Sequence, residues 1–249
     1  MTVEVFTFCW NEIAILPFAV DYWRKYASHV TVYDNGSTDG SIEYLQKQGD
    51  WISVEHFETG DKINDTLLRD IKNQVWKQAR GRADLVVVCD LDEMLCAPDI
   101  VQSLATMRRV GGTICTPQWY SLVSDEVPVY NGQSLHKIRP LAVALDGTPK
   151  AVLFDPNAII EINYDHGAHR CHPEGQVRWY GGDIYLIHVN HNLSFEHKVS
   201  RYREMKGRLS DLNKELGHGI HYSFTESILR RQWEQDHLRA VNFGAILEE

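Results

Sequence analysis

Residues 85–89 read Leu-Val-Val-Val-Cys, and this run constrains the fold more than any other part of the sequence. Five consecutive apolar residues, most of them β-branched, are typical of a strand that is buried on both faces at the centre of a parallel sheet. Such a strand needs a layer of helices on each side. The run therefore predicts an α/β protein with a mostly parallel central sheet flanked by helices.

The first 97 residues alternate between strand and helix patterns. Apolar, β-branched runs predict three further strands, at residues 2–9, 30–33 and 51–57. Helical spacing of apolar residues predicts three helices. The first spans 11–27, the second follows Thr38 or Asp39 and runs through Leu45, and the third spans 64–80. Thr38 or Asp39 can cap the second helix, and Pro17 either kinks the first or marks its late start. Alternating strands and helices imply βαβ units.

The second half of the chain is less regular. Strands are expected at 112–120, 152–154, 158–162 and 184–189, and a loop or short hairpin at 121–150. Two C-terminal helices are expected at 195–216 and 225–241, separated at Gly217 and Gly219.

Composition limits the partners and the cellular location. Acidic residues outnumber basic ones by 34 to 25, a formal net charge of -9, which argues against nucleic acid as a partner. No apolar stretch approaches the roughly 20 residues that span a bilayer, and the first residues lack a signal-peptide pattern. The five cysteines form no C-x-x-C pair and fit a reducing compartment. We therefore expect a cytoplasmic protein without a transmembrane segment, with peripheral membrane association left open.

Three carboxylates follow the central apolar run directly: Asp90, Asp92 and Glu93. Ligands of open α/β sheets bind beyond the carboxyl ends of the strands, so these acids lie where a site belongs. Asp90 and Asp92 are two residues apart and extend from the same side of a strand, where they can share Mg²⁺ or Mn²⁺. The alternative is a helix cap or a solvated turn, in which three close acids would repel one another.

Two other predicted strands also end in polar residues. Asp34 opens the segment Asp-Asn-Gly-Ser-Thr-Asp-Gly, where its carboxylate can accept hydrogen bonds from a nucleobase or a ribose, or can form an Asx-turn with its own backbone. Trp10, Asn11 and Glu12 end the first strand. The ends of these strands are expected to converge on one crevice.

Taken in order, these three motifs resemble the family 2 glycosyltransferases, which have the GT-A fold. The motifs are an Asn-Glu pair before a helix with Leu-Pro, then YDNGSTDGS, then LVVVCDLDEM. The sequence is most similar to the branch that carries an Asp-x-Asp-Glu stretch and a late histidine. The resemblance spans residues 3–95 well and extends more loosely to about residue 205.

The resemblance implies a single GT-A-like domain over residues 1–249. Residues 1–97 would bind nucleotide and metal, 98–192 would form the acceptor side, and 193–249 would be a helical extension. The implied reaction transfers a sugar from a nucleotide-diphosphate sugar, with UDP-sugar as the expected donor, to a hydroxyl of a glycan or glycoconjugate, with inversion. The implied cofactor is Mn²⁺ or Mg²⁺.

The resemblance also assigns roles to individual residues. Asp34 and the segment from Trp10 through Asn11 to Glu12 would hold the base and ribose. Asp90 would contact ribose or belong to the metal shell, and Asp92 would ligate the metal. His188 would be a further metal ligand or a diphosphate contact.

Later motifs match the family less closely. Lys150 leads a strand that ends near Pro156, and the resemblance implies that it contacts the phosphates of the donor. Phe154 and Asp155 stand where the family usually has arginine before that proline. Val189, after the late histidine, stands where the family usually has tyrosine. Lys198 belongs to a basic run that either contacts the diphosphate or forms a solvated helix face. Asp165 and His166, in a histidine-glycine turn, are the candidates for the catalytic base. Four other acids stay open for that role: Glu93, Asp125, Glu126 and Asp155.

Three other functions compete with glycosyl transfer. The His-rich segment 166–191 suggests a zinc-dependent hydrolase, with ligands drawn from His166, His169, Cys171, His172, His188 and His191. A nucleotidyltransferase also uses paired acids on an α/β sheet, but no Gly-rich basic loop follows the first predicted strand. A non-catalytic binding module is the third.

Overall fold

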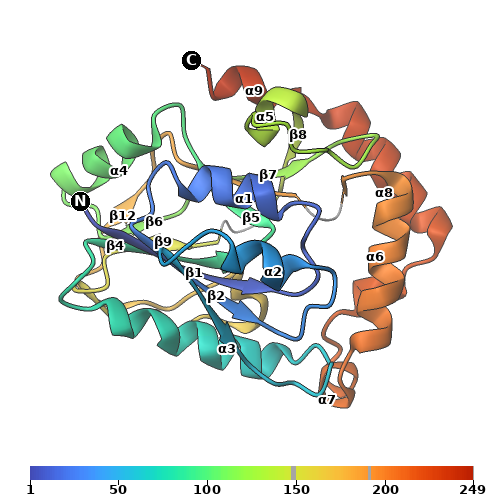
Figure 1. Ribbon diagram of the computed structural model, residues 1–249, viewed down its shortest axis with the longest axis horizontal. Coiled ribbons are helices and arrows are strands. Elements are labelled where there is room, and N and C mark those ends of the chain that lie inside the picture. Colours follow the sequence, from blue (N-terminus) through green and yellow to red (C-terminus); the bar gives the residue numbers. More distant parts are fainter. Residues whose placement is uncertain (147–149, 190–191, 249) are drawn as a thin grey trace.

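The computed structural model describes residues 1–146, 150–189 and 192–248. Its centre is a seven-stranded sheet in the order β12-β6-β9-β4-β1-β2-β3. The four strands of the first half are β1 (Val3–Cys9), β2 (His29–Asp34), β3 (Ile52–His56) and β4 (Leu85–Asp90). These four pair in parallel, which confirms the expected α/β fold with a mostly parallel central sheet (Figure 1).

The central strand β4 is buried on both faces, as its sequence predicts. Leu85 and Val87 belong to one hydrophobic core, whereas Val86 and Val88 belong to another on the opposite face. The first core includes residues of α1 (Leu16–Trp23), α2 (Ser41–Gln46) and α4 (Ile100–Arg109). The second includes Trp76 of η1 (Val75–Ala79), a 3₁₀ turn that continues α3 (Asp65–Gln74). Successive side chains of a strand point to opposite faces, so a continuous apolar run fills both cores.

Two predicted helix starts need correction. Helix α1 begins at Leu16 rather than at residue 11, with Pro17 in its first turn, where a missing N–H costs nothing. The residue before α2 is Gly40 in the left-handed conformation, so Thr38 is not the cap. Asp39 instead accepts hydrogen bonds from the backbone N–H of Ser41 and of Ile13, which ties α2 to the turn after β1.

A second, five-stranded sheet has the order β14-β8-β7-β13-β5. Its strands are β5 (Glu93–Cys96), β7 (Gln118–Leu122), β8 (Leu141–Ala144), β13 (Tyr185–His188) and β14 (Val241–Asn242). Strand β5 was not predicted, and it begins three residues after β4 ends. The acidic segment after β4 is therefore the turn that joins the two sheets.

The remaining strands of the second half are short. The strand expected at 112–120 is two strands, β6 (Ile114–Cys115) and β7, because Pro117 between them cannot donate a ladder hydrogen bond. Strand β9 (Leu153–Phe154) runs antiparallel between β4 and β6, and β12 (Trp179–Tyr180) pairs with β6. A small separate sheet pairs β10 (Ile159–Glu161) with β11 (Glu174–Gly175). The predicted loop at 121–150 contains α5 (Leu135–Ile138) and β8.

Helices end the chain, as expected. They are α6 (Phe195–Arg208), α7 (Asp211–Glu215), η4 (Ile220–Ser223), α8 (Glu226–Arg239) and α9 (Phe243–Ile246). The helix expected at 195–216 is broken after Arg208, because Leu209 forms a bridge with Ile63 and Ser210 caps α7. Helices α6 and α8 lie side by side along one end of the molecule (Figure 1). Within the described ranges, no helix combines the length and apolarity needed to cross a bilayer.

Candidate active site

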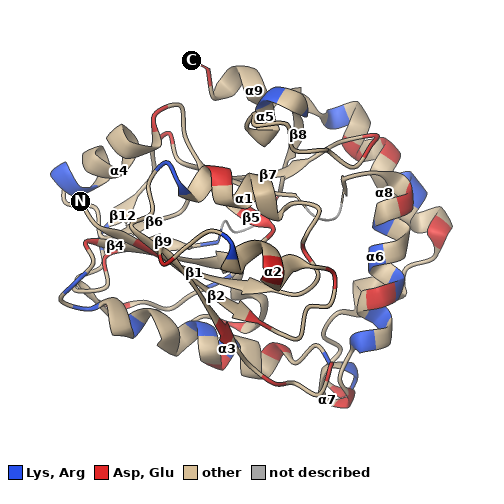
Figure 2. Cartoon of the chain, in the orientation of Figure 1, with Lys and Arg blue, Asp and Glu red and all other residues tan. Residues whose placement is uncertain are grey.

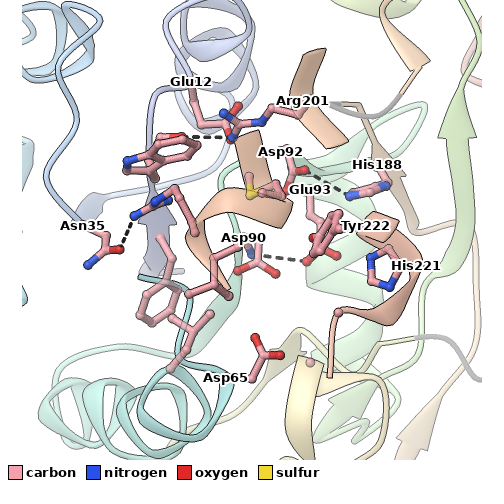
Figure 3. Close-up of a pocket in the computed structure, with 18 of the residues that line it drawn as sticks. Glu12, Asn35, Asp65, Asp90, Asp92, Glu93, His188, Arg201, His221 and Tyr222 are labelled. Carbon is pink, nitrogen blue, oxygen red and sulfur yellow. Dashed lines mark hydrogen bonds and ion pairs between the residues drawn. The ribbon is translucent and has the colours of Figure 1, made fainter. Parts of the chain in front are cut away.

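The ends of β1, β2 and β4 meet in one cavity of about 500 Å³. Both sheets and the C-terminal helices contribute to its walls (Figure 3). The residues that line it include Trp10, Glu12, Asn35, Asp65, Lys72, Asp90, Asp92, Glu93, Lys150, His188, Asn192, Lys198, Arg201, Arg208 and Asp236. The crevice that the strand-end motifs predicted is therefore present, although the motif residues do not all face it.

Asp92 and His188 are two of the three residues predicted to hold a metal, and the third is Asp90. The Oδ2 atom of Asp92 lies 3.0 Å from Nε2 of His188, and both side chains are mostly buried (Figure 3). Burial lowers the pKa of His188, but the charge and hydrogen bond of Asp92 outweigh burial and raise the pKa overall. His188 ends β13, where it stands opposite Glu93 of β5 and Ser121 of β7. The second sheet thus brings together two residues that are 96 positions apart.

This pair offers two ligand side chains to a divalent cation. In the part of the chain that the structure describes, no three His, Cys, Asp or Glu side chains gather closely enough to hold a metal ion by themselves. Mg²⁺ typically takes one or two protein ligands and completes its shell with water and substrate phosphates. The zinc cluster expected from His166, His169, Cys171 and His172 is not formed among these residues, and His191 lies outside the described residues.

Asp90 faces lysines rather than the Asp92–His188 pair. Its Oδ1 atom lies 2.6 Å from Nζ of Lys72, and its Oδ2 atom lies 3.5 Å from Nζ of Lys150. Burial raises the pKa of Asp90, but the two lysines outweigh burial and lower the pKa overall. Lys150 also lies 2.5 Å from Oε1 of Glu93, which is 1% exposed. The four side chains form one network of alternating charge in the wall of the cavity.

Lys72 is a cavity residue that was not predicted from the sequence. Its side chain is only 3% exposed, and its ammonium group lies over the ring of Phe8. A signal was available, because Lys72 stands four residues from both Leu68 and Trp76 on the apolar face of the helix pattern. A lysine in such a stripe must be paired when it is buried.

The segment after β1 contacts α6. Glu12 is buried and pairs with Arg201, which also donates to the carbonyl oxygen of Trp10 (Figure 3). The guanidinium carbons of Arg201 and Arg208 lie 4.8 and 3.5 Å from the centroid of the Trp10 ring. Asn11 does not line the cavity; it has a φ of 53°, which asparagine tolerates, and its side chain accepts a hydrogen bond from the N–H of Thr38.

Asp34 shapes the wall of the cavity without facing it. Its carboxylate accepts hydrogen bonds from the N–H groups of Gly36 and Ser37, at 2.9 and 3.1 Å, so it forms the Asx-turn that the sequence left as the alternative. The next residue, Asn35, lines the cavity and accepts a 2.8 Å hydrogen bond from Arg208. Contact between Asp34 and a nucleotide stays a prediction.

The expected catalytic bases lie outside the cavity. Asp165 is half-exposed and 3.5 Å from His172, and His166 bonds Thr66 and Arg69 of α3. Their segment, η2 (His166–Ala168), docks on α3, so only the neighbouring Gly167 and His169 reach the cavity. Three of the alternatives pair elsewhere: Asp125 with His237, Glu126 with Arg139 and Asp155 with Arg108. The fourth, Glu93, reaches the cavity wall but is held by Lys150.

The basic run of α6 is divided between two faces. Lys198, Arg201 and Arg208 are buried and line the cavity, whereas Arg203 and Lys206 are exposed. Figure 2 shows basic residues recurring along α6 among acidic ones. One face of this helix is therefore solvated and the other lines the cavity, while contact with a diphosphate stays a prediction.

Comparisons with known proteins give likenesses of fold only. No family model and no curated protein matches the chain. S. aureus TarS 1-349 in complex with UDP is 13% identical, over 91% of this chain and 73% of that chain, with a TM-score of 0.49. The same protein in complex with UDP-GlcNAc is 10% identical, over 84% and 66%, with a TM-score of 0.46. Glucosyl-3-phosphoglycerate synthase from Mycobacterium tuberculosis, with Mn²⁺ and UDP, is 19% identical over 47% and 44%, with a TM-score of 0.34.

Proposed function

We propose that this protein is a metal-dependent glycosyltransferase. It transfers a sugar from a nucleotide-diphosphate sugar to a hydroxyl of a glycan or glycoconjugate, with inversion. One observation carries the proposal: the strand-end cavity combines the Asp92–His188 pair with buried lysine and arginine side chains. A diphosphate bound through a divalent cation needs both kinds of group.

The buried cations are suited to a leaving group that gains negative charge. Lys198 is 4% exposed and donates to the neutral amide of Asn192, so water screens its charge only weakly. Lys72 and Lys150 are similarly buried but are paired with Asp90 and Glu93. Breaking the bond between sugar C1 and the diphosphate leaves negative charge on the phosphate oxygens, and preorganised cations lower the barrier to that step. Asp92 and His188 would hold the metal, which would supply further positive charge to the same oxygens when bound.

The first-half strands provide a separate region for the nucleotide. Trp10 and Asn35 line the cavity from the ends of β1 and β2, and Arg208 contacts both. An aromatic ring beside a hydrogen-bonding amide is a suitable surface for a base and ribose. The resemblance of these motifs to family 2 glycosyltransferases makes a UDP-sugar the expected donor. Zinc-dependent hydrolysis receives no such support, because its ligands do not assemble within the described residues.

A thermal-shift panel of nucleoside diphosphates with and without Mn²⁺ tests the proposal. At a ligand concentration of about 100 times Kd, binding adds about 2.7 kcal/mol to the folded state. For a chain of this size that corresponds to a rise of about 5–10 °C in Tm. UDP with Mn²⁺ should give this rise and UDP alone a smaller one.

The matched variants are Asp92→Asn and Glu43→Gln. Glu43 lies exposed on α2, away from the cavity, so its variant should behave as the wild type. Asp92→Asn should lose the part of the shift that depends on Mn²⁺ and keep the part due to UDP alone. A full Mn²⁺-dependent shift in Asp92→Asn would refute the metal assignment.

A further inference from the structure

An inverting transfer needs a proton acceptor, and none of the residues suggested by the sequence supplies one inside the cavity. His166 bonds Thr66 and Arg69 of α3, Asp165 does not line the cavity, and Glu93 is held by Lys150. The other carboxylates that line the cavity are candidate proton acceptors. These are Glu12, Asp65, Asp90, Asp92 and Asp236.

Three of these carboxylates are committed to cationic or metal-binding partners. Glu12 pairs with Arg201, Asp90 with Lys72 and Lys150, and Asp92 with His188. Protonating Glu12 or Asp90 would leave a buried cation without its partner, which is strongly unfavourable. Two carboxylates, Asp65 and Asp236, have neutral amides as their hydrogen-bond partners instead.

Asp65 and Asp236 lie on different sides of the cavity. Asp65 begins α3, which follows β3, and its Oδ2 atom accepts from the Nδ2 of Asn213 on α7. This places it beside the strands to which we assign the nucleotide. Asp236 lies on α8, which packs against α6 and β8 of the second sheet. Strand β8 belongs to residues 98–192, to which we assign the acceptor.

A short hydrogen-bonded chain orients Asp236. Its Oδ2 atom accepts a 3.2 Å hydrogen bond from Nδ2 of Asn192, which is buried. The Oδ1 atom of Asn192 accepts a 2.9 Å bond from Nζ of Lys198. Because an ammonium group only donates, Lys198 turns the amide oxygen toward itself and the amide N–H toward Asp236.

The same asparagine links Asp236 to the metal-binding pair. Its Nδ2 atom also lies 3.3 Å from Oγ of Ser121, and Ser121 stands opposite His188 in the register of β7 and β13. Asp236 is thus anchored beside the strand end that carries His188. A hydroxyl between Asp236 and a sugar bound at the Asp92–His188 pair would have its proton acceptor and its electrophile on opposite sides.

We propose that Asp236 is the general base of the transfer, oriented by Asn192 and Lys198. This inference rests on the proposed function. The acceptor oxygen forms a bond to sugar C1, and its proton passes to the carboxylate of Asp236. The bond from C1 to the diphosphate oxygen breaks, and its electron pair stays on the diphosphate. Asp236 then releases the proton to solvent, so each turnover gives the glycoside, the nucleoside diphosphate and one proton.

The test compares two nucleophiles, water and azide, in the discharge of UDP-GlcNAc and UDP-glucose with Mn²⁺. Water must lose a proton to form a stable product, whereas azide carries no proton to lose. Removing a general base typically slows a reaction about 10²–10⁴-fold. Asp236→Asn should therefore slow UDP release to water by about that factor. It should leave azide-driven release and Mn²⁺-dependent UDP binding close to the wild-type values.

Two further variants complete the comparison. Glu234→Gln removes an exposed charge from the same helix and should match the wild type with both nucleophiles. Asp65→Asn removes the other amide-bound carboxylate. In the contrary outcome, Asp65→Asn is the variant that releases UDP slowly to water but at the wild-type rate to azide, with Asp236→Asn normal in both reactions. In that case Asp65 is the base and the proposal is wrong.

Other results separate this inference from the proposed function. Equal hydrolysis by Asp236→Asn and wild type would overturn the role of Asp236 while leaving the glycosyltransferase assignment intact. A loss of azide-driven release and of UDP binding together would show that Asp236 is structural, which also overturns it. If the wild type itself neither binds UDP with Mn²⁺ nor discharges either donor, the proposed function fails, and this inference fails with it.

Discussion

The buried pair of Lys72 and Asp90 gives a prediction whose size follows from the structure. Lys72→Met keeps most of the volume and the apolar stem of the side chain but removes its charge. The Nζ atom of Lys72 lies 2.6 Å from Oδ1 of Asp90, with the two side chains 3% and 30% exposed. The substitution leaves the Asp90 carboxylate with Lys150, which is 3.5 Å away.

The expected cost is below that of a fully buried pair. Removing one partner of a fully buried ion pair costs about 3–5 kcal/mol. Because Asp90 keeps some contact with water and a second lysine, we expect about 2 kcal/mol for Lys72→Met. For a chain of this size that lowers Tm by about 4–8 °C. Lys47→Met, at an exposed site, should stay within about 0.5 kcal/mol of the wild type.

A double-mutant cycle with Asp90→Asn isolates the interaction. Chemical denaturation of the wild type, both single variants and the double variant should give a coupling free energy of about 1–2 kcal/mol. The pKa of Asp90 is lowered in the folded protein, so this stabilisation is present above the unfolded pKa of about 4 and is lost as pH falls through the folded value. A coupling near zero at pH 7 would refute the reasoning.

Two further predictions concern stability and metal binding. Burial, with the charges of Lys25 and Lys137, lowers the pKa of His136 to about 4. Below about pH 6.5 the unfolded chain binds a proton at this histidine that the folded chain does not bind until about pH 4. The free energy of unfolding should therefore fall by about 2 kcal/mol between these pH values, with solvent screening taken into account. His136→Gln should flatten the stability curve in this range, and an unchanged curve would exclude His136 as the cause. His188→Ala should raise the Mn²⁺ concentration for half-maximal UDP binding by at least about tenfold; an unchanged Mn²⁺ titration would exclude His188 as a ligand.

The central sheet could be predicted because its signals are local. Residues 85–89 have a pattern that is typical of a strand buried on both faces, and the neighbouring strand runs alternate with segments of helical spacing. Strand β5 was not predicted, because its four residues are too few to show an alternation of apolar and polar residues and directly follow the acidic turn. Its pairing with β13 is a tertiary contact between segments about 90 residues apart.

The candidate site was only partly predictable for the same reason. Asp92 and Asp34 each follow a strand, but whether a carboxylate faces the cavity or its own backbone depends on the turn that it forms. Lys72 lies on a helix face that is otherwise apolar, and Asp236 reaches the cavity only because α8 docks beside α6. Asp165 and His166 had a suitable chemical character, but η2 docks on α3 instead.

The most direct test of the central claim is UDP release from a panel of UDP-sugars, including UDP-GlcNAc, with and without Mn²⁺. The wild type and Glu43→Gln should release UDP in a metal-dependent reaction. Asp92→Asn should slow that reaction by about a hundredfold or more, because one group that holds the charge-stabilising metal is lost. Release of UDP by Asp92→Asn at the wild-type, metal-dependent rate would contradict the assignment of this cavity as a metal-dependent glycosyltransferase site.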